Sequence, residues 1–199
     1  MNRFETITRH LNPGRTSVLQ TALVLLLSVF MSACLIIEIE VTEAVEAGGE
    51  VTVRIVVQEN TADANAWRGV EIVMVPSDWT FVSAEYTASD VAGDVGAGSL
   101  EIAANWADSA VVGVGEPPAG FEYVGLISDM PYAHADTLIM EVTAKFTAGQ
   151  TNGEFPIGVI VTKESYFPSV GDWFGTDGGI NGADSTFGHV VEVTGGVGG

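Results

Sequence analysis

The segment Leu138–Phe146, LIMEVTAKF, places an apolar side chain at every second position, and this alternation decides the fold class. Successive side chains of a β-strand point to opposite faces, so the segment is predicted to be a strand with one buried and one solvated face. Similar segments bounded by turn residues recur along the chain at 37–41, 51–57, 70–74, 79–86, 100–106, 123–127, 155–161 and 190–193. We therefore expect about nine strands.

Helices are not expected after the N-terminal region, because no segment there shows a helical period over ten residues. Many short strands without intervening helices are typical of antiparallel sandwiches and barrels. The irregular stretches 87–99, 108–121 and 165–187 suit loops at the ends of a sandwich. The prediction is an all-β, antiparallel β-sandwich of jelly-roll or immunoglobulin-like type. Trp67, Trp79 and Trp106 lie at strand edges and are expected in its core.

The N-terminal region has the layout of a secretory signal peptide. Three arginines precede an apolar run over Val18–Met31, and two small residues lead into the only cysteine, Cys34. This arrangement resembles the bacterial lipobox, although Met31 stands where such motifs usually have Leu, Val or Ile. The resemblance implies a signal peptide over 1–33 and lipid attachment at Cys34. The domain would then lie in the cell envelope, anchored to the membrane and facing the periplasm or the cell surface.

Two other readings of this region stay open. Residues 18–37 form about 20 mostly apolar residues, enough to span a bilayer as an uncleaved anchor. Alternatively, the signal peptide is an ordinary one and Cys34 is simply a small residue of the run. All three readings export the remainder, which we divide into a sandwich over 34–194 and a flexible glycine-rich tail over 195–199.

The charge of the chain excludes one class of partner. The sequence holds 26 acidic and seven basic residues, a net charge of −19. Binding of nucleic acid needs clustered Lys and Arg, so that function is excluded. The spread of the acidic residues favours a solvated coat, while binding of calcium or of a basic partner stays open. With a single cysteine, the domain forms no internal disulfide and depends on its hydrophobic core.

The order of the segments is similar to that of cohesin domains. The likeness lies in 51–57, 67–72 and 76–83, and later in 136–146 followed by 153–157, so that it covers roughly 37–193. It implies a nine-stranded jelly-roll sandwich. Cohesins bind dockerins through a sheet face, but no dockerin-recognition residue carries over to this sequence, so the resemblance concerns the fold alone.

The long segment 165–187, SYFPSVGDWFGTDGGINGADSTF, holds the candidate binding residues. Asp172, Asp177 and Asp184 could bind Ca²⁺ together with backbone carbonyls, although the positions do not fit an EF-hand loop. The alternative is an ordinary turn region rich in Gly, Asp and Asn. The same segment also carries four aromatic residues, which either form a platform for a protein or glycan partner or cap the core: Tyr166, Phe167, Trp173 and Phe174.

Catalysis has little support in the sequence. His134 and Asp136 with Ser128 suggest part of a triad, but no serine lies in a Gly-x-Ser-x-Gly elbow. We expect a non-enzymatic, lipid-anchored surface module that binds a protein or glycan partner in adhesion or docking. The alternatives are a subunit of a surface filament, which would self-associate, and a hydrolase with an unrecognised site. The strand at 36–41 separates the first two, because it either pairs in its own sheet or is donated to a neighbour.

Overall fold

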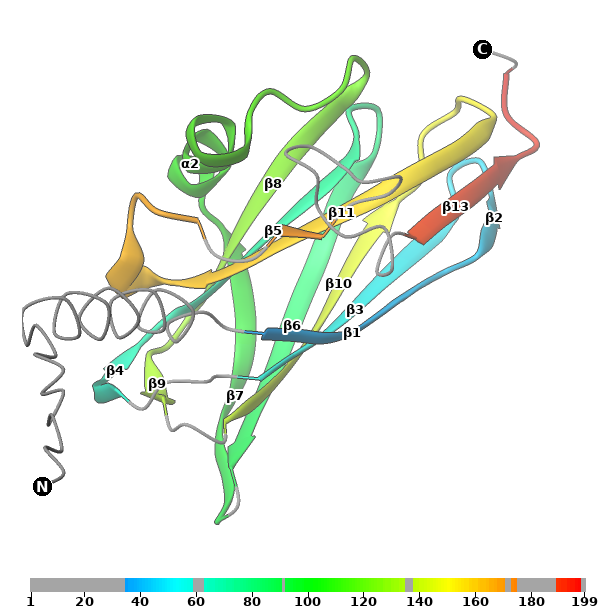
Figure 1. Cartoon of the computed structure of the whole chain (residues 1–199). Helices are drawn as coiled ribbons and strands as arrows, with labels where there is room; N and C mark the ends of the chain where they lie inside the picture. Colours follow the sequence, from blue (N-terminus) through cyan, green and yellow to red (C-terminus); the bar gives the residue numbers. More distant parts are fainter. Residues whose placement is uncertain are drawn as a thin grey trace, which may run out of the picture. The chain divides into compact units, whose positions relative to one another are not determined.

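A computed structural model describes residues 35–58, 63–90, 92–134, 138–170, 173–174 and 189–197, which form a strongly curled β-sheet with one α-helix against it (Figure 1). The expected signal segment and Cys34 lie outside these residues. Within the described ranges, no helix is long and apolar enough to cross a membrane.

Nine described strands overlap the nine predicted segments, although the strand at Gly93–Ile102 covers only 100–102 of the segment predicted at 100–106. These nine have six or more residues each: β1 (Leu35–Val41), β3 (Glu50–Gln58), β5 (Gly69–Pro76), β6 (Thr80–Asp90), β7 (Gly93–Ile102), β8 (Phe121–Ser128), β10 (Ile139–Thr147), β11 (Gly153–Lys163) and β13 (His189–Thr194). Four shorter strands were not predicted: β2 (Ala44–Glu46), β4 (Asp63–Trp67), β9 (Tyr132–His134) and β12 (Trp173–Phe174). The all-β class is thus confirmed.

One sheet forms both layers of the sandwich. Its strand order is β1-β3-β10-β6-β7-β8-β5-β11-β13-β2, with β12 beside β11, and β4 and β9 pair separately. Strand β7 is the corner, because its first part pairs with β6 and residues 100–102 pair with β8. All pairs are antiparallel except β13 with β2. The inner faces of the two halves enclose the main core, to which β10 contributes Met140, Val142, Ala144 and Phe146.

The helix α2 (Ala104–Val114) corrects the expectation that the exported part has none. Its buried residues Trp106, Ala110 and Val114 recur every four positions and form a second core with the outer face of β5, β8 and β11. The helical spacing is not evident in the sequence, because the residues from Leu100 to Trp106 also follow the period of two that is typical of a strand. On β8, a side chain at Gly125 would lie 2.6 Å from the carbonyl oxygen of Ala103, so the glycine allows the helix to approach.

One further expectation needs correction, and part of the C-terminal tail can be described. The stretch 87–99 is not a loop, since β6 extends to Asp90 and β7 begins at Gly93 to form a hairpin. Of the tail 195–199, the structure describes 195–197, and these residues are held to the turn before β11. There the Val197 N–H donates to the carbonyl of Gln150 at 2.8 Å, and the Gly196 N–H donates to the Asn152 side chain at 2.6 Å.

Strand β5 is buried along its whole length and carries a carboxyl group, that of Glu71, on its inner face. Its cross-strand neighbours are Leu126 on β8 and Val161 on β11, both of which belong to the main core. Neither carboxyl oxygen of Glu71 has a hydrogen-bond partner among the described residues. Burial therefore raises the pKa of Glu71 to about 8, and the side chain is mostly protonated at neutral pH.

This raised pKa predicts a specific pH dependence of stability. Because the unfolded chain releases the Glu71 proton near its ordinary pKa of 4.5 while the folded protein keeps it to about 8, the free energy of unfolding should fall as pH rises between these values and level off above. The Glu71→Gln variant cannot titrate. Denaturant unfolding measures the free energy of unfolding of both proteins. The value for the wild type minus that for the variant should decrease from pH 5 to pH 9. A constant difference would contradict the assignment.

Candidate functional site

The outer face of the five strands β1, β3, β10, β6 and β7 carries mostly polar side chains, and we call it the acidic face. The alternation along each strand turns every second side chain outward. Strand register then aligns these side chains into two rows across the sheet. One row is Glu40, Arg54, Thr143, Glu85 and Ser99, and the other is Glu38, Val56, Glu141, Thr87 and Ala97.

Arg54 organises the part of the acidic face nearest β1. Its Nη1 lies 2.8 Å from Glu38 Oε2 and 3.1 Å from Glu40 Oε2, while Nε lies 2.7 Å and Nη2 3.1 Å from the two oxygens of Glu141. The bidentate hydrogen bonds from Arg54 hold the pKa of Glu141 below its ordinary value. The three carboxylates thus share a single guanidinium across β1, β3 and β10.

Glu85 lies on the same face but lacks such compensation. Thr143 separates it from Arg54 in the first row, and two strand spacings place their backbones about 9–10 Å apart. The other cation of the face, Lys145, pairs with Glu50 at 3.0 Å. Among the described residues Glu85 is exposed and forms no ion pair. Its negative charge is therefore available to a partner.

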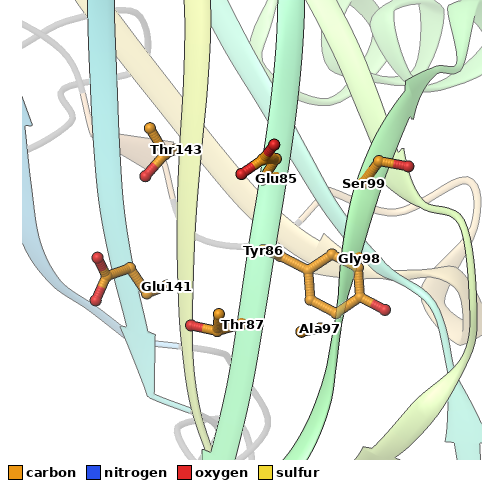
Figure 2. A pocket seen from close by; sticks show the side chains of 8 residues that line it. All are labelled: Glu85, Tyr86, Thr87, Ala97, Gly98, Ser99, Glu141 and Thr143. Atoms are coloured by element: carbon orange, nitrogen blue, oxygen red, sulfur yellow. The ribbon is translucent and has the colours of Figure 1, made fainter.

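A hollow of about 590 Å³ lies over this part of the acidic face. Figure 2 shows Glu85 and Glu141 at opposite corners of a group of four side chains, with Thr87 and Thr143 at the other two. Toward β7 the surface continues with the small residues Ala97, Gly98 and Ser99. The short side chains of Thr87 and Thr143, together with those of β7 beyond Glu85, leave the sheet surface low around the carboxylates, and this explains the hollow.

Beyond the hollow, Asp129 adds a further carboxylate near the end of β8. It accepts hydrogen bonds from the Ser99 N–H at 3.2 Å and from the Ser99 hydroxyl at 3.0 Å. These hydrogen bonds hold the pKa of Asp129 below its ordinary value, and the bond from the Ser99 N–H makes the largest contribution. A side chain at Gly98 would come within 2.4 Å of this carboxylate, so the glycine makes room for it.

Of the four residues predicted as an aromatic platform, Tyr166 and Phe167 have described side chains, and these contact different groups. Tyr166 ends the 3₁₀ turn η1 (Glu164–Tyr166), and the Lys163 ammonium lies 5.1 Å from its ring centre. Phe167 is 50% exposed and meets the Trp106 ring edge to face at 5.1 Å. The backbones of Trp173 and Phe174 form β12 beside β11. The structure therefore gives Tyr166 and Phe167 different ring partners.

The predicted calcium ligands Asp172, Asp177 and Asp184 lie outside the described residues. Within the described ranges, no group of three or more His, Cys, Asp or Glu side chains is placed to hold a metal ion. The acidic face was not predicted as a site. Its outward residues follow from the alternation, but which strands pair, and so which carboxylates meet, is not visible in the local pattern.

Comparison with known proteins begins with two negative results. No protein-family model matches the chain. No curated protein matches it either.

Several solved structures are similar in fold. The C-terminal domain of the Streptococcus agalactiae AgI/II polypeptide BspA is 11% identical over 76% of this chain and 45% of that one, with a TM-score of 0.42. A collagen-binding domain from a Staphylococcus aureus adhesin is 10% identical over 77% and 96%, and a cohesin module from a Clostridium perfringens family 33 glycoside hydrolase is 10% identical over 82% and 98%, each with a TM-score of 0.37. The chain spans less than half of the BspA chain. At these values the likeness concerns strand arrangement alone.

The assignment of Arg54 as the organiser of the acidic face can be tested by titration. In Arg54→Gln the pKa of Glu141 should rise toward its ordinary value of 4.5, because the charged hydrogen bonds that lower it are lost. Carboxyl-carbon NMR measures this pKa directly. Lys145→Gln is the matched control, since Lys145 pairs with Glu50, and it should leave the Glu141 pKa unchanged. An unchanged Glu141 pKa in Arg54→Gln would contradict the network.

Proposed function

We propose that the chain is a non-enzymatic, exported binding domain, anchored to the membrane by lipid at Cys34, that docks a basic protein segment on its acidic face. The observation that carries the proposal is the uncompensated carboxylate of Glu85 beside a hollow in a five-stranded polar face. An extended basic peptide presents every second side chain to one side, so that its cations can follow a row of the sheet.

Electrostatics supports a basic partner over an acidic one. The face holds Glu38, Glu40, Glu50, Glu85 and Glu141 against two cations, Arg54 and Lys145, both of which are already paired within it. The whole chain has a net charge of −19, which repels anionic surfaces and speeds the approach of cations. A positively charged segment is thus attracted to the domain from a distance and can then pair with carboxylates of the acidic face.

The position of β1 speaks against the alternative of a filament subunit that donates its first strand. Residues 35–41 pair with β3 of the same chain along the whole strand. Arg54 on β3 adds ion pairs to Glu38 and Glu40 on β1. Donation to a neighbour would have to break both sets of interactions, so a binding role for the single domain is favoured.

The lipid anchor predicts a defined mature N-terminus. Mass spectrometry of the protein from the membrane fraction of a bacterial host should find a lipid-modified peptide that begins at Cys34. Cys34→Ala should move the protein out of that fraction, whereas Ser32→Ala, which keeps the cysteine, should retain it. An unprocessed N-terminus with membrane retention of Cys34→Ala would show an uncleaved anchor instead.

The docking role predicts a local charge effect. A fluorescently labelled peptide of alternating lysine and threonine should bind the domain at an ionic strength of about 0.15 M. Glu85→Lys should weaken binding about tenfold or more, as expected for loss of a close charge pair. Fluorescence anisotropy measures the affinity.

The matched control for this experiment is Glu192→Lys, which changes the net charge equally but lies exposed on β13 in the other layer. It should change the affinity less than about twofold, because screened long-range charge contributes little. Equal losses in the two variants would show that the acidity acts only as a general coat, and the proposed docking face would be wrong.

A further inference from the structure

A second pocket, of about 650 Å³, lies where the start of α2 meets the turn that follows β11. We call it the Phe167 pocket. Its volume falls within the usual range for small-molecule sites, about 300–1,000 Å³. It is lined by residues from β7, from the first turn of α2, from β8 and from the turn after β11. It is separate from the acidic face, with which it shares no lining residue.

One wall of the pocket is an exposed aromatic ring in a fixed position. Phe167 is half exposed, while the Trp106 ring that it meets edge to face is 1% exposed beneath the helix. A buried partner of this size restrains the exposed ring, which lowers the entropy lost when a ligand packs against it. Ile102, 61% exposed, adds apolar surface nearby.

The polar part of the pocket wall is formed by an ion pair between Arg68 and Glu164. Arg68 donates from Nε to Glu164 Oε2 at 3.0 Å and from Nη2 to Glu164 Oε1. The Glu164 N–H also donates to the Arg68 carbonyl at 2.9 Å. The hydrogen bond from Arg68 holds the pKa of Glu164 below its ordinary value. The pair is bidentate and both side chains are about one-third exposed, so their remaining N–H groups and lone pairs are available to a ligand.

The remaining polar groups determine the charge of the ligand. Glu101 lies close enough to Arg68 to raise the pKa of its guanidinium, after the larger contribution of Glu164. The pocket thus carries two carboxylates against one guanidinium, and this net negative charge disfavours an anion. A cationic group has no lone pair with which to accept from the remaining Arg68 N–H groups, so it would leave these donors unmatched. Asn105 supplies a neutral amide with both donors and an acceptor. A neutral ligand rich in hydroxyl groups satisfies this set.

We propose that the Phe167 pocket binds a neutral saccharide. A sugar ring has an apolar face of C–H groups, which packs on Phe167, and a rim of hydroxyls. Those hydroxyls accept from Arg68 and Asn105 and donate to Glu101 and Glu164. This inference is independent of the docking role of the acidic face, because the two pockets lie on different surfaces.

Titration with four neutral hexasaccharides, maltohexaose, cellohexaose, xylohexaose and chitohexaose, tests the proposal by calorimetry and NMR. At least one should bind with a dissociation constant below about 1 mM, and Phe167→Ala should weaken it at least tenfold. Asn105→Ala, which changes an exposed side chain and leaves the aromatic contact intact, should weaken binding as well.

The control variant is Val112→Ala, at an 87% exposed position of the same helix, and it should bind like the wild type. Glu85→Lys should also bind the saccharide normally, which separates this site from the acidic face. Absence of binding to all four sugars would overturn the proposal. So would binding that neither Phe167→Ala nor Asn105→Ala weakens.

Discussion

The burial of β5 on both faces is the constraint on which the rest of the structure depends. Its inner face closes the main core, and its outer face is covered by α2. Apolar burial is the main favourable contribution to folding, so a strand buried on both sides fixes its neighbours β8 and β11 as well. The helix in turn places Trp106 beneath Phe167. A carboxyl group in such a strand is costly to ionise, and the neutral form of Glu71 is how the fold accommodates it.

The corner strand β7 explains why the chain has two distinct surfaces. Its first part extends the acidic face, and its last residues turn toward β8 and lead into α2. Gly96 and Gly98 lie in the first part, where residues without side chains let a strand bend and let neighbours approach. Ala97 and Ser99 line the hollow, while Glu101 and Ile102, further along the same strand, line the Phe167 pocket.

Most of the strands could be predicted from the sequence, whereas the candidate sites could not, and the reason is physical. A period of two is a local property, and it located eight of the nine long strands, whereas most of β7 lies in a stretch that was predicted to be a loop. Local alternation also misled, because Leu100 to Trp106 obeys it although α2 begins at Ala104. The rows of the acidic face depend on pairings such as Arg54 with Thr143, which are far apart in the chain. Phe167 was a candidate from composition, but its neighbour Arg68 could be found only from the fold.

The acidic residues do not all have the same surroundings. Some have a cation beside them and others do not, and this difference distinguishes a specific binding surface from a general acidic coat. Where a cation is present, as at Arg54 and Arg68, hydrogen bonds position the carboxylates around it and the cation offsets part of their charge. Exposed pairs of this kind contribute little to stability, typically about 0–1 kcal/mol, so their value lies in positioning. The four basic residues after Cys34 are Arg54, Arg68, Lys145 and Lys163. With so few cations available, Glu85 is left with an uncompensated charge beside ordered neighbours, which is the arrangement that a basic partner can recognise.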